Sequence, residues 1–195
     1  MAMNATRGRS GRAAPVLCLA VTLLYTGVWI AGSMGYRINV TPSVPVGIWR
    51  VMPLSGKIER GQIVSICPPL NAGFIEARAR GYLSKGRCPG GLEPMLKPVA
   101  AIAGDVIEQS PDGLVLNGVT LPDTAALAAD SSGRPLSSPR AARFAIADNE
   151  VFLVSTAIGR SFDSRYFGPL RLTAIEGLAV PVWVVAERPW HETRG

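Results

Sequence analysis

The longest apolar stretch of the chain lies near its N-terminus and predicts one membrane-spanning helix. No charged residue occurs between Arg12 and Arg37, and residues 13–36 are mostly apolar or small. A helix of about 20 residues is long enough to span the hydrocarbon core of a bilayer. Arginines at positions 7, 9 and 12 precede the stretch. Because positive charge accumulates on cytoplasmic flanks, we expect this end to face the cytoplasm.

A cleaved secretory signal peptide is the alternative interpretation of this segment. Ala31-Gly-Ser33 supplies small residues of the kind found at cleavage sites. The apolar run is longer than the apolar region of a usual signal peptide, which favours a retained anchor. We therefore expect residues 1–12 in the cytoplasm, residues 13–36 in the membrane and residues 37–195 on the far side. In a Gram-negative bacterium the far side is the periplasm.

Beyond this segment, short apolar runs alternate with turn-forming residues, a pattern typical of a mainly β domain. Residues 62–67 predict a strand that ends at Pro68-Pro69. The turn Ser110–Gly113 joins residues 106–109 to residues 114–116 as in a hairpin, and Asn117-Gly118 predicts a second tight turn. Further strands are expected at residues 144–146 and 150–155, on either side of the turn Asp148-Asn149, and at residues 179–186, with Pro181 at an edge or a bulge.

Two segments interrupt the β pattern. Residues 71–85 carry Ala, Glu, Arg and Leu at helical spacing, with Asn71 as the candidate N-cap and Gly86 as the stop. Residues 123–140 are rich in Ala, Ser, Pro and Gly without a period, which predicts a loop insertion. The expected architecture is mainly β with a short helical insertion, preceded by one N-terminal transmembrane helix.

Length and charge limit the classes of function. The chain has 195 residues, of which 48% are hydrophobic. That is enough for one packed domain and one membrane segment, and too little for two large domains. The net charge of +6 is modest, and the basic residues are scattered rather than interleaved with aromatic ones. We therefore expect no nucleic-acid partner.

The cysteines fit a domain outside the cytoplasm. Cys67 and Cys88 lie in the expected exported part, where a disulfide persists, whereas Cys18 falls inside the apolar run. Two cysteines and the single His191 near the C-terminus make a poor ligand set for zinc. We expect a Cys67–Cys88 bridge that pins a loop or the short helical insertion, and no metal or other cofactor.

The candidate chemistry is a serine activated by a lysine. Ser43 lies a few residues after the apolar segment, and a serine hydroxyl needs a neighbouring base to become a nucleophile. With His191 as the one histidine, a Ser-His-Asp triad is not expected. Lys97 stands among Met, Leu, Pro, Val and Ala, whereas Lys57 and Lys85 stand among polar residues. Burial lowers a lysine pKa from about 10.4 toward neutral pH, so Lys97 is the candidate base.

Each of these segments also has a structural interpretation. Ser43 stands between two prolines and is typical of a turn, and Lys97 could extend along a strand edge with its amine in water. The run from Arg160 to Pro169 could be a polar turn with a structural Asp163–Arg165 pair. The occurrence of all three in this order after an apolar anchor favours a serine–lysine peptidase.

Three segments resemble the conserved boxes of bacterial type I signal peptidases. They run from Thr41 to Trp49, from Lys97 to Asp105 and from Ser161 to Gly168. The likeness is greatest for the TraF-type conjugative transfer peptidases, which Cys67-Pro-Pro and Cys88-Pro-Gly-Gly also resemble. The resemblance reaches from the apolar segment to Trp183 and leaves out the 123–140 loop and the tail. It implies a signal-peptidase-like, twisted antiparallel β domain.

The resemblance also implies roles for matching residues. Ser43 matches the nucleophile and Lys97 the general base. Ser161 matches a hydroxyl that orients the lysine amine, and Asp163 and Arg165 match a pair that supports the site from behind.

The oxyanion hole and two departures complete the comparison with the family. Thr41 matches the position whose hydroxyl helps to form the oxyanion hole with the backbone N–H of Ser43. General signal peptidases usually carry Met after the serine, where this chain has Val44, and a Gly-Asp-Asn-Arg run where it has residues 156–160. Both departures favour a specialised substrate.

The expected function is that of a membrane-anchored serine endopeptidase. TraF-type enzymes are associated with maturation of a conjugative pilin, including the joining of its ends into a ring. The expected partners are a protein substrate, either the pilin precursor or another exported protein, and the lipid of the bacterial inner membrane. Two alternatives stay open: a general type I leader peptidase, and a non-catalytic membrane-anchored scaffold of a conjugation or secretion channel.

Overall fold

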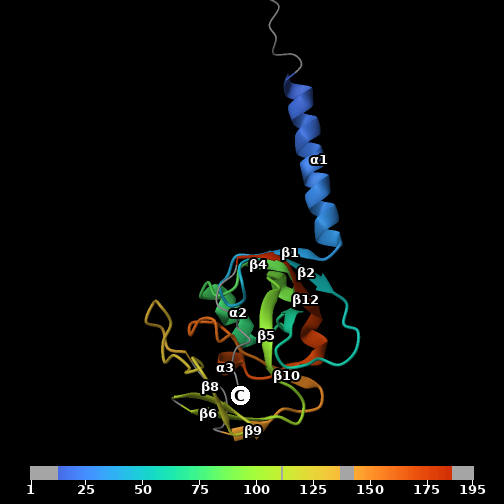
Figure 1. Cartoon of the computed structure of the whole chain (residues 1–195). Helices are drawn as coiled ribbons and strands as arrows, with labels where there is room; N and C mark the ends of the chain where they lie inside the picture. Colours follow the sequence, from blue (N-terminus) through green and yellow to red (C-terminus); the bar gives the residue numbers. More distant parts are fainter. Residues whose placement is uncertain (1–12, 111, 137–142, 186–195) are drawn as a thin grey trace, which may run out of the picture. The chain divides into compact units, whose positions relative to one another are not determined.

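The computed structural model describes residues 13–110, 112–136 and 143–185 (Figure 1). The expectations for residues 1–12 and for His191 fall outside these ranges. The chain divides into two units, residues 1–36 and residues 37–195, which we describe separately.

The N-terminal unit is a single apolar helix. Helix α1 covers Ala13–Ser33, and Met34-Gly35 forms a turn before strand β1 begins at Tyr36. The helical part is therefore three residues shorter than the predicted 13–36 segment. Its length and composition are sufficient to cross a membrane, and none of its side chains from Ala14 to Ser33 is buried inside the protein. An apolar helix with an apolar surface on all sides fits a single-pass membrane anchor.

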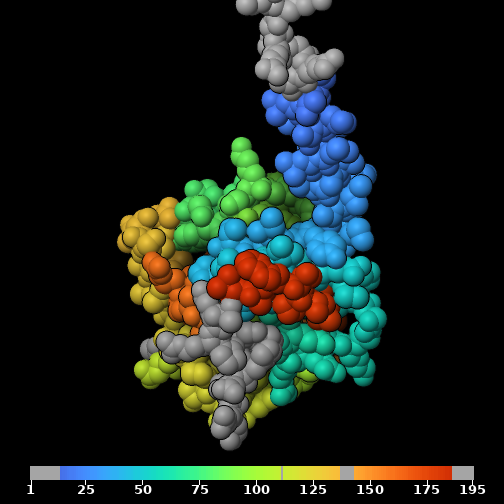
Figure 2. All heavy atoms as spheres, turned by 45° about the horizontal axis from the view of Figure 1, so that its top comes forward, coloured from blue at the N-terminus to red at the C-terminus, as the bar shows by residue number. Residues whose placement is uncertain are grey.

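The larger sheet carries most of the second unit. It has seven strands in the order β1-β2-β12-β3-β5-β10-β11, and the pairs from β2 to β11 are antiparallel. The strands are β1 (Tyr36–Asn39), β2 (Gly47–Met52), β3 (Ile63–Ile66), β5 (Met95–Ala101), β10 (Glu150–Leu153), β11 (Leu170–Arg171) and β12 (Ile175–Val184). Strand β12, red in Figure 2, bears exposed apolar side chains, among them Val180, Val182 and Trp183.

A smaller antiparallel sheet packs beside the first. Its order is β8-β7-β6-β9, built from β6 (Val106–Ser110), β7 (Gly113–Leu116), β8 (Val119–Leu121) and β9 (Arg143–Ala145). The two predicted turns are confirmed. Asn117 and Gly118 take φ values of 49° and 85°, as the tight turn between β7 and β8 requires. Ile107 and Leu114 of this sheet share one buried cluster with Ala101 and Phe152 of the larger sheet.

Helix α2 (Ala72–Ala79) closes the other side of the core. Its N-cap is Asn71, as predicted, whose side chain accepts a 3.1 Å hydrogen bond from the N–H of Phe74. The predicted extension to residue 85 is wrong, because Gly81 takes a φ of 83° and ends the helix. Residues 85–88 form strand β4 (Lys85–Cys88) instead, followed by the 3₁₀ turn η2 (Pro89–Gly91). Phe74 and Ala77 pack into the main cluster of the larger sheet with Val64 and Val99.

The strands expected around Asp148-Asn149 form but do not pair with each other. Strand β9 pairs with β6 in the smaller sheet, whereas β10 pairs with β5 and β11 in the larger one. The chain therefore changes sheets at this turn. The short helix α3 (Ser164–Phe167) lies between β10 and β11, and the 3₁₀ turn η3 (Leu172–Ala174) leads into β12. Of the predicted loop insertion, residues 123–136 are described and contain only the isolated bridge Ala129–Pro135.

Pro181 stands beside a bulge, as predicted. The register between β12 and β2 shifts between Pro181 and Trp183, and β3 pairs only with the first part of β12. Gly47 lies opposite this bulge, where an added Cβ would stand 2.2 Å from the carbonyl oxygen of Trp183. Glycine is therefore required for β2 to reach β12 directly after the Ser43 loop.

Candidate active site

The Ser43 loop, residues 40–46 between β1 and β2, is held by one asparagine. The side-chain amide of Asn39 donates to the carbonyl oxygens of Thr41, Val44 and Pro45 at 2.8, 3.0 and 3.1 Å. Its oxygen accepts from the hydroxyl of Thr41 at 2.9 Å. The loop thus folds around the side chain of Asn39, the residue that precedes it, and these hydrogen bonds fix Ser43 without regular secondary structure. The hydroxyl oxygens of Thr41 and Ser43 lie 3.4 Å apart.

Two further contacts fix the loop from outside. The indole N–H of the buried Trp49 donates to the carbonyl of Pro45 at 2.9 Å. The hydroxyl of Ser155 donates to the carbonyl of Ser43 at 2.6 Å. Neither Asn39 nor Ser155 was predicted as a site residue. An Asn two residues before a Thr-Pro turn is a usable local signal for the first, but Ser155 is 112 positions away from Ser43, and its contact follows only from the topology.

Lys97 lies on the buried face of β5. Burial alternates along this strand, so Lys97 faces the interior together with Met95, Val99 and Ala101. Its side chain is only 5% exposed, which excludes the interpretation as a strand-edge lysine with its amine in water. Burial lowers the pKa of Lys97 from 10.5 to about 8; the charge of Asp163 raises this pKa and that of Arg165 lowers it. About a tenth of the amine is therefore neutral at pH 7, and about half of it is neutral at pH 8.

Ser161 provides the hydrogen-bond partner of this amine. The Nζ of Lys97 donates to the Oγ of Ser161 at 2.8 Å, and both groups are buried. Ser161 is held in turn by its own segment, because the guanidinium of Arg165 donates to the carbonyl oxygen of Ser161 at 3.3 Å. The bond orients the amine while leaving its lone pair available in the neutral form.

Asp163 and Arg165 form a fully buried ion pair behind Ser161. Two nitrogens of Arg165 donate to the two carboxylate oxygens of Asp163 at 2.8 and 2.9 Å, and neither side chain is exposed. The same carboxylate accepts from the backbone N–H of Ser155 at 3.2 Å. Asp163 therefore links two parts of the site. On one side it accepts from Ser155, which holds Ser43, and on the other it pairs with Arg165, which holds Ser161.

Ser43 and Lys97 line the same groove. It has a volume of about 470 Å³ and is bounded by β1, the Ser43 loop, the first half of β5, and residues 158–162. Along the groove the backbone of Met95–Lys97 pairs with β3 only, since among the described strands β10 pairs with β5 at Val99 and Ala101. The N–H of Val154 donates to the carbonyl oxygen of Pro98, and beyond Val154 the chain no longer pairs with β5. The edge of β5 beside Lys97 is therefore open. An extended peptide can pair with such an edge.

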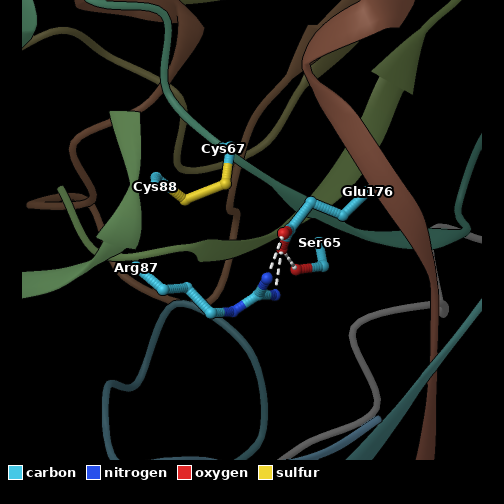
Figure 3. Close-up of a disulfide and its surroundings, with 5 residues drawn as sticks. All are labelled: Ser65, Cys67, Arg87, Cys88 and Glu176. Carbon is cyan, nitrogen blue, oxygen red and sulfur yellow. Dashed lines mark hydrogen bonds and ion pairs between the residues drawn. A yellow bond between two sulfur atoms is a disulfide. The ribbon is translucent and has the colours of Figure 1, made fainter. Parts of the chain in front are cut away.

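A disulfide joins Cys67 to Cys88, as expected, and ties β4 to the end of β3 (Figure 3). Beside it, Arg87 forms an ion pair with Glu176 at 2.7 Å, and the hydroxyl of Ser65 donates to the same carboxylate at 2.8 Å. Ser65 also lines the groove. Within the described residues, Cys67, Cys88 and Glu176 are the one cluster with metal-ligand spacing, but disulfide sulfurs carry no thiolate to bind a metal.

Comparison with known proteins gives consistent matches over most of the chain. Residues 10–184 match the family model described as signal peptidase, peptidase S26. A conjugal transfer protein TraF from Agrobacterium fabrum is 41% identical over 83% of this chain and 90% of its own length. A probable conjugal transfer protein TraF from Sinorhizobium fredii is 40% identical over 91% and 94%, and a plasmid transfer protein TraF from Escherichia coli is 38% identical over 84% and 89%. A crystal structure of a signal peptidase I from Enterococcus faecalis aligns with 63% of this chain and 97% of its own, at 20% identity and a TM-score of 0.37.

Proposed function

Because the chain belongs to the peptidase S26 family of signal peptidases, we propose that it is a membrane-anchored serine peptidase in which neutral Lys97 activates Ser43. The observation that carries the proposal is the state of Lys97. Its amine is buried in the groove that contains Ser43, and burial lowers its pKa to about 8. A buried lysine with no such task would be an unfavourable choice at this position of the sheet.

The proposed reaction proceeds through an acyl-enzyme. Neutral Lys97 removes the proton of Ser43, and the Ser43 oxygen attacks the carbonyl carbon of the scissile peptide bond. The backbone N–H of Ser43 and the hydroxyl of Thr41 stabilise the developing oxyanion, the hydroxyl after rotation from its present acceptor on Asn39. Pro42 has no N–H to offer, so a flanking hydroxyl is a suitable second donor. Ser161 orients the lysine amine, and the Asp163–Arg165 pair supports Ser161.

The groove favours an extended segment of the substrate. The open edge at Met95–Lys97 supplies backbone hydrogen bonds for a strand that ends at Ser43. Small side chains next to the scissile bond are expected to fit best in this groove, which β1, the Ser43 loop and β5 line.

The names of the relatives support a role in conjugation. The relatives described above are named as conjugal or plasmid transfer proteins, so we propose a conjugative pilin precursor as the substrate. The helix α1 would anchor the enzyme in the bacterial inner membrane, with residues 37–195 in the periplasm, close to substrates that emerge from the bilayer. The residues of the site are compatible with release of the acyl group to water or to the amino terminus of the substrate. An intact-mass measurement on the processed pilin distinguishes them, because the cyclic product is lighter by one water than the trimmed linear chain.

The test of the proposal compares single substitutions in membranes. Ser43→Ala and Lys97→Ala should each abolish processing of the pilin precursor while the protein remains folded and membrane-bound. Ser161→Ala should retain measurable activity, since Ser161 orients the base without replacing it. Lys57→Ala is the matched control, because Lys57 is exposed outside the groove. Full activity in either the Ser43 or the Lys97 variant would exclude the dyad. Absence of processing by the wild-type protein would favour a non-catalytic scaffold, whereas cleavage of ordinary exported precursors would favour a general leader peptidase.

A further inference from the structure

A second cleft meets the groove at Ser43. Pro42 and Ser43 line both hollows, so the hydroxyl-bearing residue stands at their junction. The second cleft has a volume of about 330 Å³, and most of its walls are apolar. It is bounded by the Ser43 loop, the second half of β5, the end of β8 and the following proline, and residues 154–157.

Strand β5 passes from one hollow into the other. Leu96 and Lys97 line the groove, and Pro98, Val99 and Ala100 line the second cleft. A peptide lying across Ser43 therefore extends into both. The part that is acylated occupies one hollow, and the part that departs occupies the other.

The backbone pairing of β5 decides which part lies where. Beside the groove β5 has an open edge, but beside the second cleft it is paired on both sides, with β3 at Pro98 and with β10 at Val99. The groove can thus hold a strand by main-chain hydrogen bonds, whereas the second cleft holds its occupant by side-chain packing. A site that makes no main-chain hydrogen bonds to its occupant suits the group that must leave and be replaced.

The charges at the second cleft favour a neutral amine. Arg60 is the one charged side chain that lines it among the described residues, and its guanidinium is paired with Asp105 outside the lining. No carboxylate lines the cleft to hold an ammonium. An attacking amine must be neutral to use its lone pair, and this environment does not stabilise the protonated form.

We propose that the second cleft binds the peptide segment that follows the scissile bond and, after that segment leaves, the amine that resolves the ester. This inference rests on the proposed function. In acylation the Ser43 oxygen bonds to the acyl carbon, the C–N bond breaks, and Lys97 passes its proton to the departing nitrogen. In the reverse sense, an incoming amine bonds to the acyl carbon and the ester C–O bond breaks. The proton of the amine goes to Lys97, and Ser43 regains its own. By microscopic reversibility the departing and the attacking amine share one site.

The test uses the full-length protein in detergent and separates acylation from transfer. N-acetyl-alanine p-nitrophenyl ester serves as the acyl donor, because its leaving group contains no peptide. Valyl-leucine amide serves as the apolar acceptor. The burst of nitrophenolate measures acylation of Ser43, and the ratio of acetyl-alanyl-dipeptide to acetyl-alanine measures transfer against hydrolysis. Ala157→Phe fills the second cleft from an exposed position, and Ala147→Phe is the matched control on an exposed turn outside both hollows.

The wild-type ratio should saturate with acceptor concentration, as binding to a site requires. Ala157→Phe should lower that ratio by about tenfold, the discrimination typical of an apolar pocket, while the amplitude of the burst, which counts the Ser43 residues that are acylated, stays unchanged. Ala147→Phe should behave as wild type. A ratio in Ala157→Phe within about twofold of wild type, or a wild-type ratio that never saturates, would overturn the assignment of the second cleft. A burst that persists in Ser43→Ala would instead contradict the proposed function itself.

Discussion

The hydroxyl of Ser155 holds the carbonyl oxygen of Ser43 at 2.6 Å, and both residues are buried. The bond fixes the peptide plane that follows the candidate nucleophile. Ser155→Ala should lower kcat by about tenfold, or ~1.4 kcal/mol, because the Ser43 loop loses a buried hydrogen bond. KM should change little, since the groove walls remain. Steady-state kinetics on a peptide spanning the cleavage site measures both constants.

A matched control for this variant exists in the smaller sheet. The hydroxyl of Ser110 also donates to a backbone carbonyl, that of Gly113, at 3.1 Å. Ser110→Ala removes the same chemical group at a residue that does not line the groove, and it should leave kcat unchanged. Equal losses in the two variants would mean that Ser155 acts through general stability alone.

Activity should rise with pH through about 8. The pKa of Lys97 is lowered to about 8 by burial, and only the neutral amine can accept the Ser43 proton. The acylation rate should therefore increase about tenfold per pH unit below this value and level off above it. Single-turnover acylation between pH 5.5 and 9.5 measures the profile. An acylation rate that is independent of pH across this range would exclude Lys97 as the base.

Lys97 should also make the protein more stable as pH rises between about 8 and 10.5. In that window the unfolded chain binds the lysine proton and the folded chain does not, so the free energy of unfolding increases with pH. Lys97→Met should remove this dependence and stabilise the protein by roughly 3 kcal/mol at most below pH 8. Denaturant unfolding at pH 7 and pH 10 gives the two values. Lys57→Met is the control, because an exposed lysine has no such burial cost. An identical pH dependence in Lys97→Met and wild type would contradict the burial of the charge.

Arg165→Leu should be the most destabilising substitution near the site. It leaves the buried carboxylate of Asp163 without its ion-pair partner, which should lower the free energy of unfolding by about 4 kcal/mol. Arg143→Leu breaks the exposed pair with Glu108 in the smaller sheet and should cost less than about 1 kcal/mol. Thermal unfolding of both variants gives the comparison. Similar melting temperatures would mean that the buried pair contributes little to the fold.

Removal of the disulfide should weaken both the fold and the groove. The Cys67–Cys88 bridge closes a loop of 21 residues, so replacing both cysteines by serine should cost roughly 3 kcal/mol. Arg87, next to Cys88, should then pair less well with Glu176, which also binds the groove residue Ser65. KM should rise as a result. Dithiothreitol should reproduce the effect in wild type and have none on the double variant; an effect on both would point to another target.

Local chemistry could be predicted from the sequence, and long-range pairing could not. The turns at Ser110–Gly113 and Asn117-Gly118 depend on adjacent residues, so their prediction was sound. Burial of Lys97 followed from its apolar neighbours. The predicted helix is longer than the observed one because Gly81, and not Gly86, ends it.

The connections around the site depend on topology. Ser155 ends an apolar run, which gives no sign that it meets Ser43. The pairing of β9 and β10 with different sheets likewise depends on competition between distant strands rather than on the turn between them. Patterns along the chain thus identify the chemical groups, but the contacts that align them require the complete sheet.

The unpaired stretch of β5 also determines which proteins could be attacked. An exposed edge strand of a sheet can pair with the edge strand of any other sheet, including that of a second folded copy. Here the free stretch belongs to an inner strand, because β5 pairs with β3 along this stretch and with β10 farther along, and the stretch faces a groove that can receive an extended chain. Folded proteins, whose strands are already paired with neighbouring strands, would not be cleaved, whereas an unfolded terminal segment would be.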